Sequence, residues 1–148
     1  MAHGLQKFGY LGGRGMTATV GMMEHIGVRP AGLWAWLVSL VEVGGGLLMI
    51  VGLLGFVAPF AIAANMAVAA VTVHAAKGFW NSNGGYEFNL VIAGAAVASG
   101  LLGFGAWSLD AIVGLALPDW LLVGWAVAMV IGVVGALFSR NVETRAAA

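Results

Sequence analysis

Four long apolar stretches, separated by short polar segments, dominate the pattern of this chain. They cover residues 33–57, 59–76, 89–107 and 120–138. A bilayer core about 30 Å thick is crossed by roughly 20 mostly apolar residues in a helix. The pattern therefore predicts an all-α fold, an integral membrane bundle of about four transmembrane helices, with residues 1–148 forming a single domain.

The segments between these spans are short. Pro59 suits the first turn of a helix, where its missing N–H does no harm, so the first two spans form a tight antiparallel hairpin. Residues 77–88 and 108–119 are polar loops. In the mixed segment 1–32, residues 16–26 are expected to form a short amphipathic helix on the membrane surface.

The composition supports a membrane protein over a soluble one. Hydrophobic residues make up 61% of the chain and charged residues 8%, whereas a soluble domain is about 25% charged. A net charge of zero gives no case for a nucleic-acid partner. The absence of cysteine excludes disulfides, thiolate metal sites and cysteine catalysis.

The basic residues all fall on one side of a four-span topology. The opposite side has no Lys or Arg, and its longer loop carries two aspartates. The positive-inside rule places the basic side in the cytoplasm. The residues counted are Lys7, Arg14, Arg29, Lys77, Arg140 and Arg145.

Glu42 is the polar residue that most needs explaining. It lies about nine residues into the first span, roughly 14 Å deep at the rise of an α-helix. A carboxylate at that depth has to be protonated, paired or facing water. Two interpretations stay open: a structural, hydrogen-bonded residue that fixes helix register, or a carboxyl that handles protons or binds a ligand.

Further polar side chains gather on the membrane face from which Glu42 is reached. The prediction is one polar pocket, walled by the first two spans and lidded by loop 77–88, while Asn65, Asp110 and Asp119 belong to the opposite half. Simpler interpretations remain for some members, because an interfacial His74 is often structural and residues 83–87 compose a turn. No residue is expected to be catalytic or to bind metal. The candidate ligand-binding residues are Glu42, His74, His3, Gln6, Lys7, Tyr86 and Glu87.

Several motifs resemble the DoxX family. They are HGLQK at 3–7, FGYLGGRG at 8–15, HIGVRP at 25–30, WLVSLVEVGGGLLMIVGLL at 36–54, TVHAAKGFWNSNGGYEFNL at 72–90 and SLDAIVG at 108–114. The family consists of four-helix membrane proteins, and some members resemble small subunits of quinone-linked thiosulfate oxidation. The resemblance implies a redox-associated subunit of a bacterial-type plasma (inner) membrane. It also implies no intrinsic cofactor, a quinone as candidate ligand, and other membrane subunits or further copies of the chain as partners.

The chain departs from the family pattern at both ends. In the family, HGLQK ends a complete first membrane helix, whereas only two residues precede His3 here. The first family helix is therefore expected to be truncated. The apolar span 120–138 follows the family region as an additional helix.

Three functional hypotheses remain at this point. The first is a subunit of a quinone-linked redox or oxidative-stress complex that binds quinone or lipid in the polar pocket. The second is a non-catalytic structural or assembly subunit, for which glycine-rich faces would dock other helices. The third, a small-solute transporter, lacks the inverted repeat and broken helices of such proteins. Catalysis by the chain alone is not expected, because no metal cluster, dinucleotide fingerprint or nucleophile–base arrangement is present.

Overall fold

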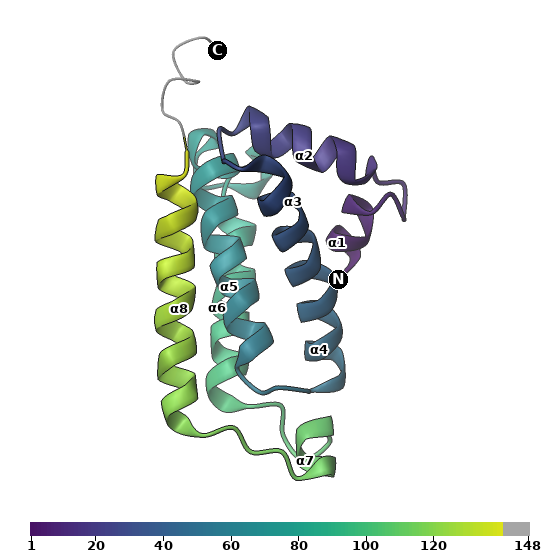
Figure 1. Cartoon of the computed structure of the whole chain (residues 1–148), viewed down its shortest axis with the longest axis vertical. Coiled ribbons are helices and arrows are strands. Elements are labelled where there is room, and N and C mark those ends of the chain that lie inside the picture. Colours follow the sequence, from purple (N-terminus) through teal and green to yellow (C-terminus); the bar gives the residue numbers. More distant parts are fainter. Residues whose placement is uncertain (141–148) are drawn as a thin grey trace.

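The computed structural model describes residues 1–140, and all the named elements of that part are helices, which confirms the predicted all-α bundle (Figure 1). Residues 141–148, and with them Arg145 of the basic-residue count, lie outside the described residues. The N-terminus lies beside the middle of the bundle, and the segment that follows it crosses one end (Figure 1). The long helices that come next then alternate in direction along the bundle.

Three helices in the described part are long and apolar enough to cross a membrane. The first is a continuous rod, Ala31–Val51, made of α3 (Ala31–Leu40), the π-helical turn η1 (Val41–Gly45) and α4 (Gly46–Val51). The second, Val57–Lys77, joins α5 (Val57–Ala69) to the π-helical turn η2 (Ala70–His74) and the 3-10 turn η3 (Ala75–Lys77). The third is α8 (Asp119–Phe138). A shorter apolar helix, α6 (Glu87–Leu102), completes the bundle, so the chain is an integral membrane protein.

Two helices end earlier than the hydrophobic pattern predicts. The first rod stops at Val51, because Gly52 and Leu54 take left-handed backbone conformations with φ of 64° and 63°. The third predicted span, 89–107, stops at Leu102, because Gly103 has a φ of 74°. The residues that follow, GLLGF at 52–56 and GFGAW at 103–107, extend the apolar pattern without extending the helix. At 1.5 Å per residue, α6 is about 24 Å long.

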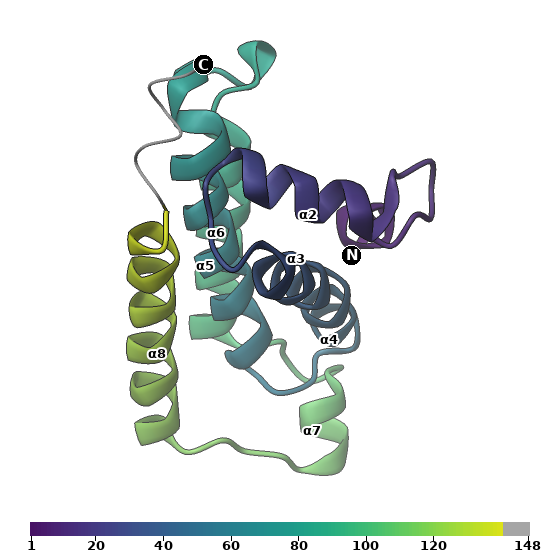
Figure 2. The ribbon, with the colours of Figure 1, turned by 45° about the horizontal axis from the view of Figure 1, so that its top comes forward.

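The N-terminal region forms two short helices. The predicted surface helix corresponds to α2 (Gly15–His25), which lies across the end of the bundle over α3 (Figures 1 and 2). Its Met23 is buried against Ala31 and Ala35 of α3. The helix therefore packs on the bundle with one face, rather than only resting on a membrane surface.

The other short helix, α1 (Ala2–Lys7), packs against η1 in the antiparallel direction. Gly4 allows the close approach, since a Cβ at this position would lie 2.8 Å from both the Glu42 Cβ and the Val43 backbone nitrogen. The rings of Phe8 and Trp36 meet further along, with centroids 5.6 Å apart. The HGLQK segment thus lies directly beside Glu42.

The C-terminal helix α8 packs beside α5 and is joined to the bundle at both ends. Trp125 donates its indole N–H to the Val57 carbonyl, with Nε1 and O 2.9 Å apart. At the other end, Arg140 Nε donates to the Ile26 carbonyl at 3.1 Å. These bonds place the end of α8 beside the connection between α2 and α3.

Asp110 organises the end of the bundle opposite α2. It belongs to the short helix α7 (Leu109–Val113). Its Oδ1 accepts from the Leu54 backbone N–H at 3.0 Å and its Oδ2 from that of Gly55 at 2.7 Å. The SLDAIVG motif therefore contributes the clamp that fixes the loop between α4 and α5.

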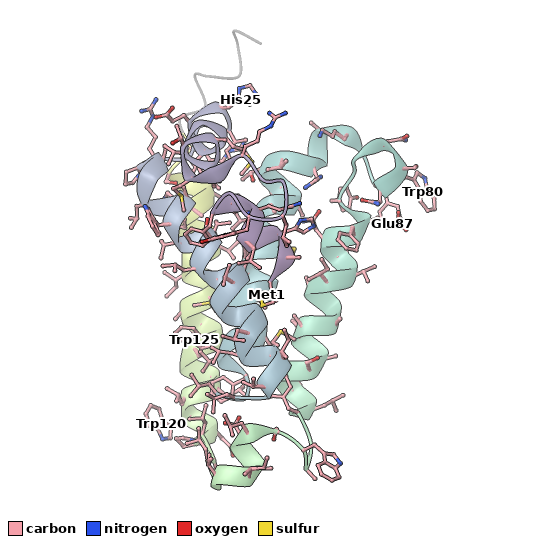
Figure 3. All side chains as sticks on the ribbon, turned by 90° about the vertical axis from the view of Figure 1, so that its right-hand side faces the viewer. Met1, His25, Trp80, Glu87, Trp120 and Trp125 are labelled. Atoms are coloured by element: carbon pink, nitrogen blue, oxygen red, sulfur yellow. The ribbon has the colours of Figure 1, made fainter. Side chains whose placement is uncertain are left out.

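The outer faces of the long helices are apolar. Ile50, Val91 and Ile131 are each more than half exposed, and large side chains project outwards along the bundle (Figure 3). Soluble monomers rarely expose continuous apolar surfaces of this extent. The surface is suited to contact with the lipid bilayer.

Candidate functional site

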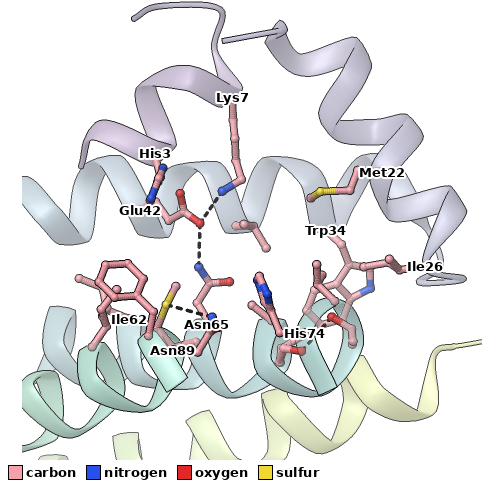
Figure 4. Close-up of a pocket in the computed structure, with 18 of the residues that line it drawn as sticks. His3, Lys7, Met22, Ile26, Trp34, Glu42, Ile62, Asn65, His74 and Asn89 are labelled. Carbon is pink, nitrogen blue, oxygen red and sulfur yellow. Dashed lines mark hydrogen bonds and ion pairs between the residues drawn. The ribbon is translucent and has the colours of Figure 1, made fainter. Parts of the chain in front are cut away.

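A cavity of about 650 Å³ lies between the N-terminal segment and the first membrane hairpin. Side chains from α1, α2, α3, η1, α5, η2 and α6 line it (Figure 4). Most of its wall is apolar, including Met22, Ile26, Trp34, Ile62 and Ile92. A few polar residues interrupt that wall: His3, Lys7, Glu42, Asn65, Thr72, His74, Asn81 and Asn89.

Glu42 forms the centre of the polar part of this cavity. The Lys7 ammonium of α1 forms an ion pair with its Oε1. Asn65 of α5 donates its Nδ2 to the same oxygen at 3.2 Å. Both bonds are visible in Figure 4, where the lysine and asparagine approach from opposite sides. Three separate helical segments thus converge on one carboxylate oxygen.

The second carboxylate oxygen, Oε2, is buried and has no hydrogen-bond partner. The Glu42 side chain as a whole is only 12% exposed. An unsatisfied buried acceptor costs about 1–3 kcal/mol, and more when the group is charged. Glu42 is therefore held in a costly position, and unsatisfied groups of this kind are rare enough in folded proteins to call for an explanation.

Glu42 and His74 share an unusual backbone setting. Glu42 lies in the π-helical turn η1 and His74 ends the π-helical turn η2. A π-turn inserts an extra residue into a helix and shifts the side chains that follow, and such turns are frequent at functional sites. Each membrane-spanning rod of the first hairpin therefore presents its candidate side chain from a local irregularity.

His74 lines the cavity and is held in place by the loop that follows it in sequence. Its Nδ1 lies 2.7 Å from the Gly84 carbonyl oxygen. A carbonyl can only accept, so Nδ1 carries the hydrogen, and in the neutral ring Nε2 is left as an acceptor. The ring itself lines the cavity (Figure 4).

The rest of the loop, residues 78–86, is organised by its own contacts. A Cβ on Gly85 would lie 2.2 Å from the Gly78 carbonyl oxygen, so this position needs glycine. Glu87 accepts a bond from the Asn81 backbone N–H at 3.0 Å, and Tyr86 packs edge-on against Phe79 with ring centroids 5.5 Å apart. The side chains of Tyr86 and Glu87 therefore shape the loop and are not among the residues that line the cavity.

Two residues of the HGLQK segment are exposed. His3 Nδ1 lies 3.1 Å from Gln6 Oε1, and Gln6 Nε2 donates weakly to the Leu11 carbonyl at 3.4 Å. His3 lines the cavity and Gln6 does not. Of the seven candidate residues, the structure brings His3, Lys7, Glu42 and His74 to one cavity, whereas Gln6, Tyr86 and Glu87 lie outside its wall.

The expectation that Asn65 belongs to the opposite half of the bundle is wrong. Glu42 precedes the loop 52–56 and Asn65 follows it by nearly the same number of residues, so the antiparallel hairpin brings the two together. These nearly equal distances from the loop are the feature of the sequence that could have predicted the contact between Glu42 and Asn65. Asn89, only 7% exposed, was also missed; its Nδ2 points at the Met66 sulfur, 3.7 Å away.

Within residues 1–140, no group of three or more His, Asp or Glu side chains is arranged to hold a metal ion. The arrangement offers instead an apolar cavity with a carboxylate, an ammonium, two imidazoles and several amides on its wall. Such a mixture binds and orients an amphiphilic molecule, since the apolar wall takes a ring or chain and the few polar groups fix a headgroup.

Comparison with known proteins adds one finding. A family model described as DoxX matches residues 1–75, the region that holds Lys7, Glu42, Asn65 and His74. No curated protein and no solved structure matches the chain.

Proposed function

The chain belongs to the DoxX family, and from this premise we propose that it is a membrane subunit of a quinone-linked redox or oxidative-stress complex. In this proposal it binds the headgroup of a quinone-type amphiphile in the cavity around Glu42. Partner subunits in a bacterial-type plasma (inner) membrane supply any further redox centre. The observation that carries the proposal is a largely apolar cavity on whose wall Lys7, Asn65 and Glu42 form one bonded polar cluster.

The shape and chemistry of the cavity favour a ligand with a polar ring and an apolar tail. About 650 Å³ is within the usual range of small-molecule sites. Trp34, Ile62 and Ile92 offer flat and branched apolar surface, and Glu42 and His74 stand on the same wall. A quinone headgroup carries oxygens on both sides of a six-membered ring and an isoprenoid tail that is soluble in the bilayer.

The polar residues have distinct roles in this proposal. Glu42 receives the headgroup, and Lys7 and Asn65 hold its carboxylate in place through Oε1. His74, which is fixed by its hydrogen bond to the Gly84 carbonyl, contributes a second polar contact to the ligand. Loop 78–86 sets the orientation of the His74 ring and so shapes that end of the site.

The experiment blocks the cavity with a bulky side chain and measures how much quinone or hydroquinone the protein retains. Wild-type protein in lipid nanodiscs is equilibrated with a decyl quinone and with the corresponding hydroquinone, and bound ligand is quantified after separation. Ala69 lines the cavity, so Ala69→Trp is expected to abolish retention of both forms. Ala98→Trp, an exposed position of α6 outside the cavity, is the matched control.

The expected result is ligand bound to the wild type and to Ala98→Trp but not to Ala69→Trp. Thermal unfolding of each variant establishes that it is folded. If folded wild-type protein retains neither redox form, the proposed ligand is wrong.

A second candidate function, assembly of a larger membrane complex, is favoured by one feature of α8. Gly124, Gly132 and Gly135 have open space where a side chain would project. With Ala128 between them, Gly124 and Gly132 belong to a run of small residues four apart, and this spacing lets membrane helices approach closely. Replacing Gly132 by Leu would block docking there, so loss of co-purifying subunits from native membranes would support this role. Unchanged co-purification would count against it.

A further inference from the structure

We infer that residues 103–118, which join α6 to α8, lie in the interface of the bilayer rather than in water. In this arrangement α7 is embedded among the lipid headgroups and the first carbons of their acyl chains, and it anchors its end of the bundle in the membrane. The direction of the polar side chains, the exposure of the apolar ones and the length of α6 support this placement. The inference is independent of the proposed quinone site.

The polar side chains of this segment are bonded within the protein. Asp110 accepts two backbone N–H groups of the loop 52–56, at 3.0 and 2.7 Å. Ser108 is buried, and its hydroxyl accepts a backbone N–H of α7 at 3.2 Å and donates to a backbone carbonyl at 2.7 Å. Apart from the Trp107 indole, residues 103–118 contain no other polar side chain. Hardly any side-chain group of the segment therefore requires water.

The large apolar side chains of the segment point the other way. Trp107 is 95% exposed, and Ile112 and Val113 of α7 are each more than half exposed. Trp120, at the start of α8, projects from the same end of the bundle (Figure 3). A loop in water turns its polar groups outwards and its apolar groups inwards, so this segment has the inverse arrangement. Tryptophan is also enriched at the level of the lipid headgroups.

The length of α6 brings the segment to the lipid. The helix begins at Glu87, whose carboxylate is bonded to the loop 78–86 at the other end of the bundle, and it ends at Leu102. Its length of about 24 Å is less than the thickness of a hydrocarbon core, about 30 Å. With Glu87 at one boundary of the core, Leu102 does not pass beyond the other. The segment that follows therefore starts in contact with lipid.

The backbone of the segment limits its depth. Residues 103–108 and 114–118 lie outside helices, and irregular backbone exposed to the hydrocarbon core would leave N–H and C=O groups without partners. The exposed Asp119 follows directly. Both features place the segment in the interface, where headgroups and water supply hydrogen bonds.

Lipid is the occupant of this apolar patch that the structure favours. Leu101 and Val123, at the neighbouring ends of α6 and α8, are each more than half exposed, and they belong to the apolar faces suited to the bilayer. The patch on α7 continues these faces around the end of the bundle. A second copy of the chain is the competing occupant, and the test distinguishes the two.

The test measures the depth of α7 in a membrane. The natural sequence has no cysteine, so a nitroxide can be attached to a single introduced one. The sites are Ile112→Cys and Val113→Cys in α7, Ile131→Cys near the middle of α8, and Ser82→Cys in the exposed part of the loop 78–86. Each variant is reconstituted in vesicles of phosphatidylcholine and phosphatidylglycerol, and thermal unfolding establishes that it is folded. Power-saturation EPR then compares nitroxide collisions with oxygen, which concentrates in lipid, and with a water-soluble nickel chelate.

The expected depth of the two α7 labels is about 5–10 Å below the headgroup boundary, as for interfacial helices. Their oxygen-to-chelate collision ratio should lie above that of the Ser82 label and below that of the Ile131 label. Chelate collisions as frequent as at Ser82 would overturn the inference, because the segment would then lie in water. Protection of both α7 labels from both reagents would also overturn it, because a second copy of the chain would then cover the patch.

Discussion

Asn65 donates a hydrogen bond to Glu42 across the first membrane hairpin, with Nδ2 and Oε1 3.2 Å apart. The loop 52–56 lies nearly midway between them in sequence, so the contact fixes the register of two antiparallel helices at the depth of the cavity. The asparagine also bonds one oxygen of a carboxylate whose other oxygen is buried without a hydrogen-bond partner. One bond thus serves both the hairpin and the candidate site.

Replacing Asn65 by Leu should destabilise this hairpin. The change removes a donor from a buried carboxylate and brings an apolar group against it, at a cost of about 1–2 kcal/mol. Unfolding titrations in mixed detergent micelles measure this loss. Asn83→Ala, at an exposed loop position, serves as the control and should unfold like the wild type. Equal stability of both variants would mean that the bond contributes nothing.

The hydrophobic pattern was enough to predict the helical bundle, because a span of apolar residues has few alternatives in a bilayer. It placed the ends of α8 within a residue, since a proline and an aspartate mark its start. It placed the end of α6 five residues too late. Gly103 turns the chain out of the helix with a positive φ of 74°, and hydropathy averages do not register that change.

The site was predictable only in part, for a geometric reason. The depth of Glu42 and the position of Lys7 near the start of the chain pointed to a shared pocket, which the structure contains. The contribution of Asn65 depended on its distance from the loop 52–56, which nearly equals that of Glu42, and the pattern of apolar residues does not register that relationship. Tyr86 and Glu87 were on the expected face, but their contacts are with their own loop.

Gly4→Ala should separate α1 from the first membrane rod. The added Cβ would lie 2.7 Å from a Val43 methyl and 2.8 Å from the Glu42 Cβ, so the helices have to move apart. Overpacking of this kind costs about 1–3 kcal/mol. The measurement is thermal unfolding, with Gly21→Ala as the control, because α2 has open space at Gly21. The control should be neutral or slightly stabilising, since alanine favours a helix.

His74→Leu should loosen the loop between η3 and α6. The substitution removes the donor to the Gly84 carbonyl, which ties residues 78–86 to the end of the cavity. Faster amide hydrogen exchange across that loop is the expected result, with little change in α8. His25→Leu, at an exposed position of α2, provides the comparison. Unchanged exchange in the loop of the His74 variant would show that the bond does not hold it.

Asp110→Ala should destabilise the connection between α4 and α5. The carboxylate accepts two backbone N–H groups, those of Leu54 and Gly55, and no other acceptor replaces it there. Charge-assisted bonds are stronger than neutral ones, so the expected loss is about 2–3 kcal/mol. Asp119→Ala, at the exposed start of α8, should cost less than 1 kcal/mol, the usual size of a favourable charge near a helix N-terminus.

Lys7→Met should be more harmful alone than in combination with a change at Glu42. The single variant leaves a buried carboxylate without its counter-charge, and breaking such a pair costs roughly 3–5 kcal/mol. In Lys7→Met/Glu42→Leu no charge remains to be neutralised, so its loss should be clearly smaller than the sum of the two single losses. Unfolding titrations of all four proteins complete the cycle, with the exposed Lys77→Met as the control. Additive losses would show that Lys7 and Glu42 act independently.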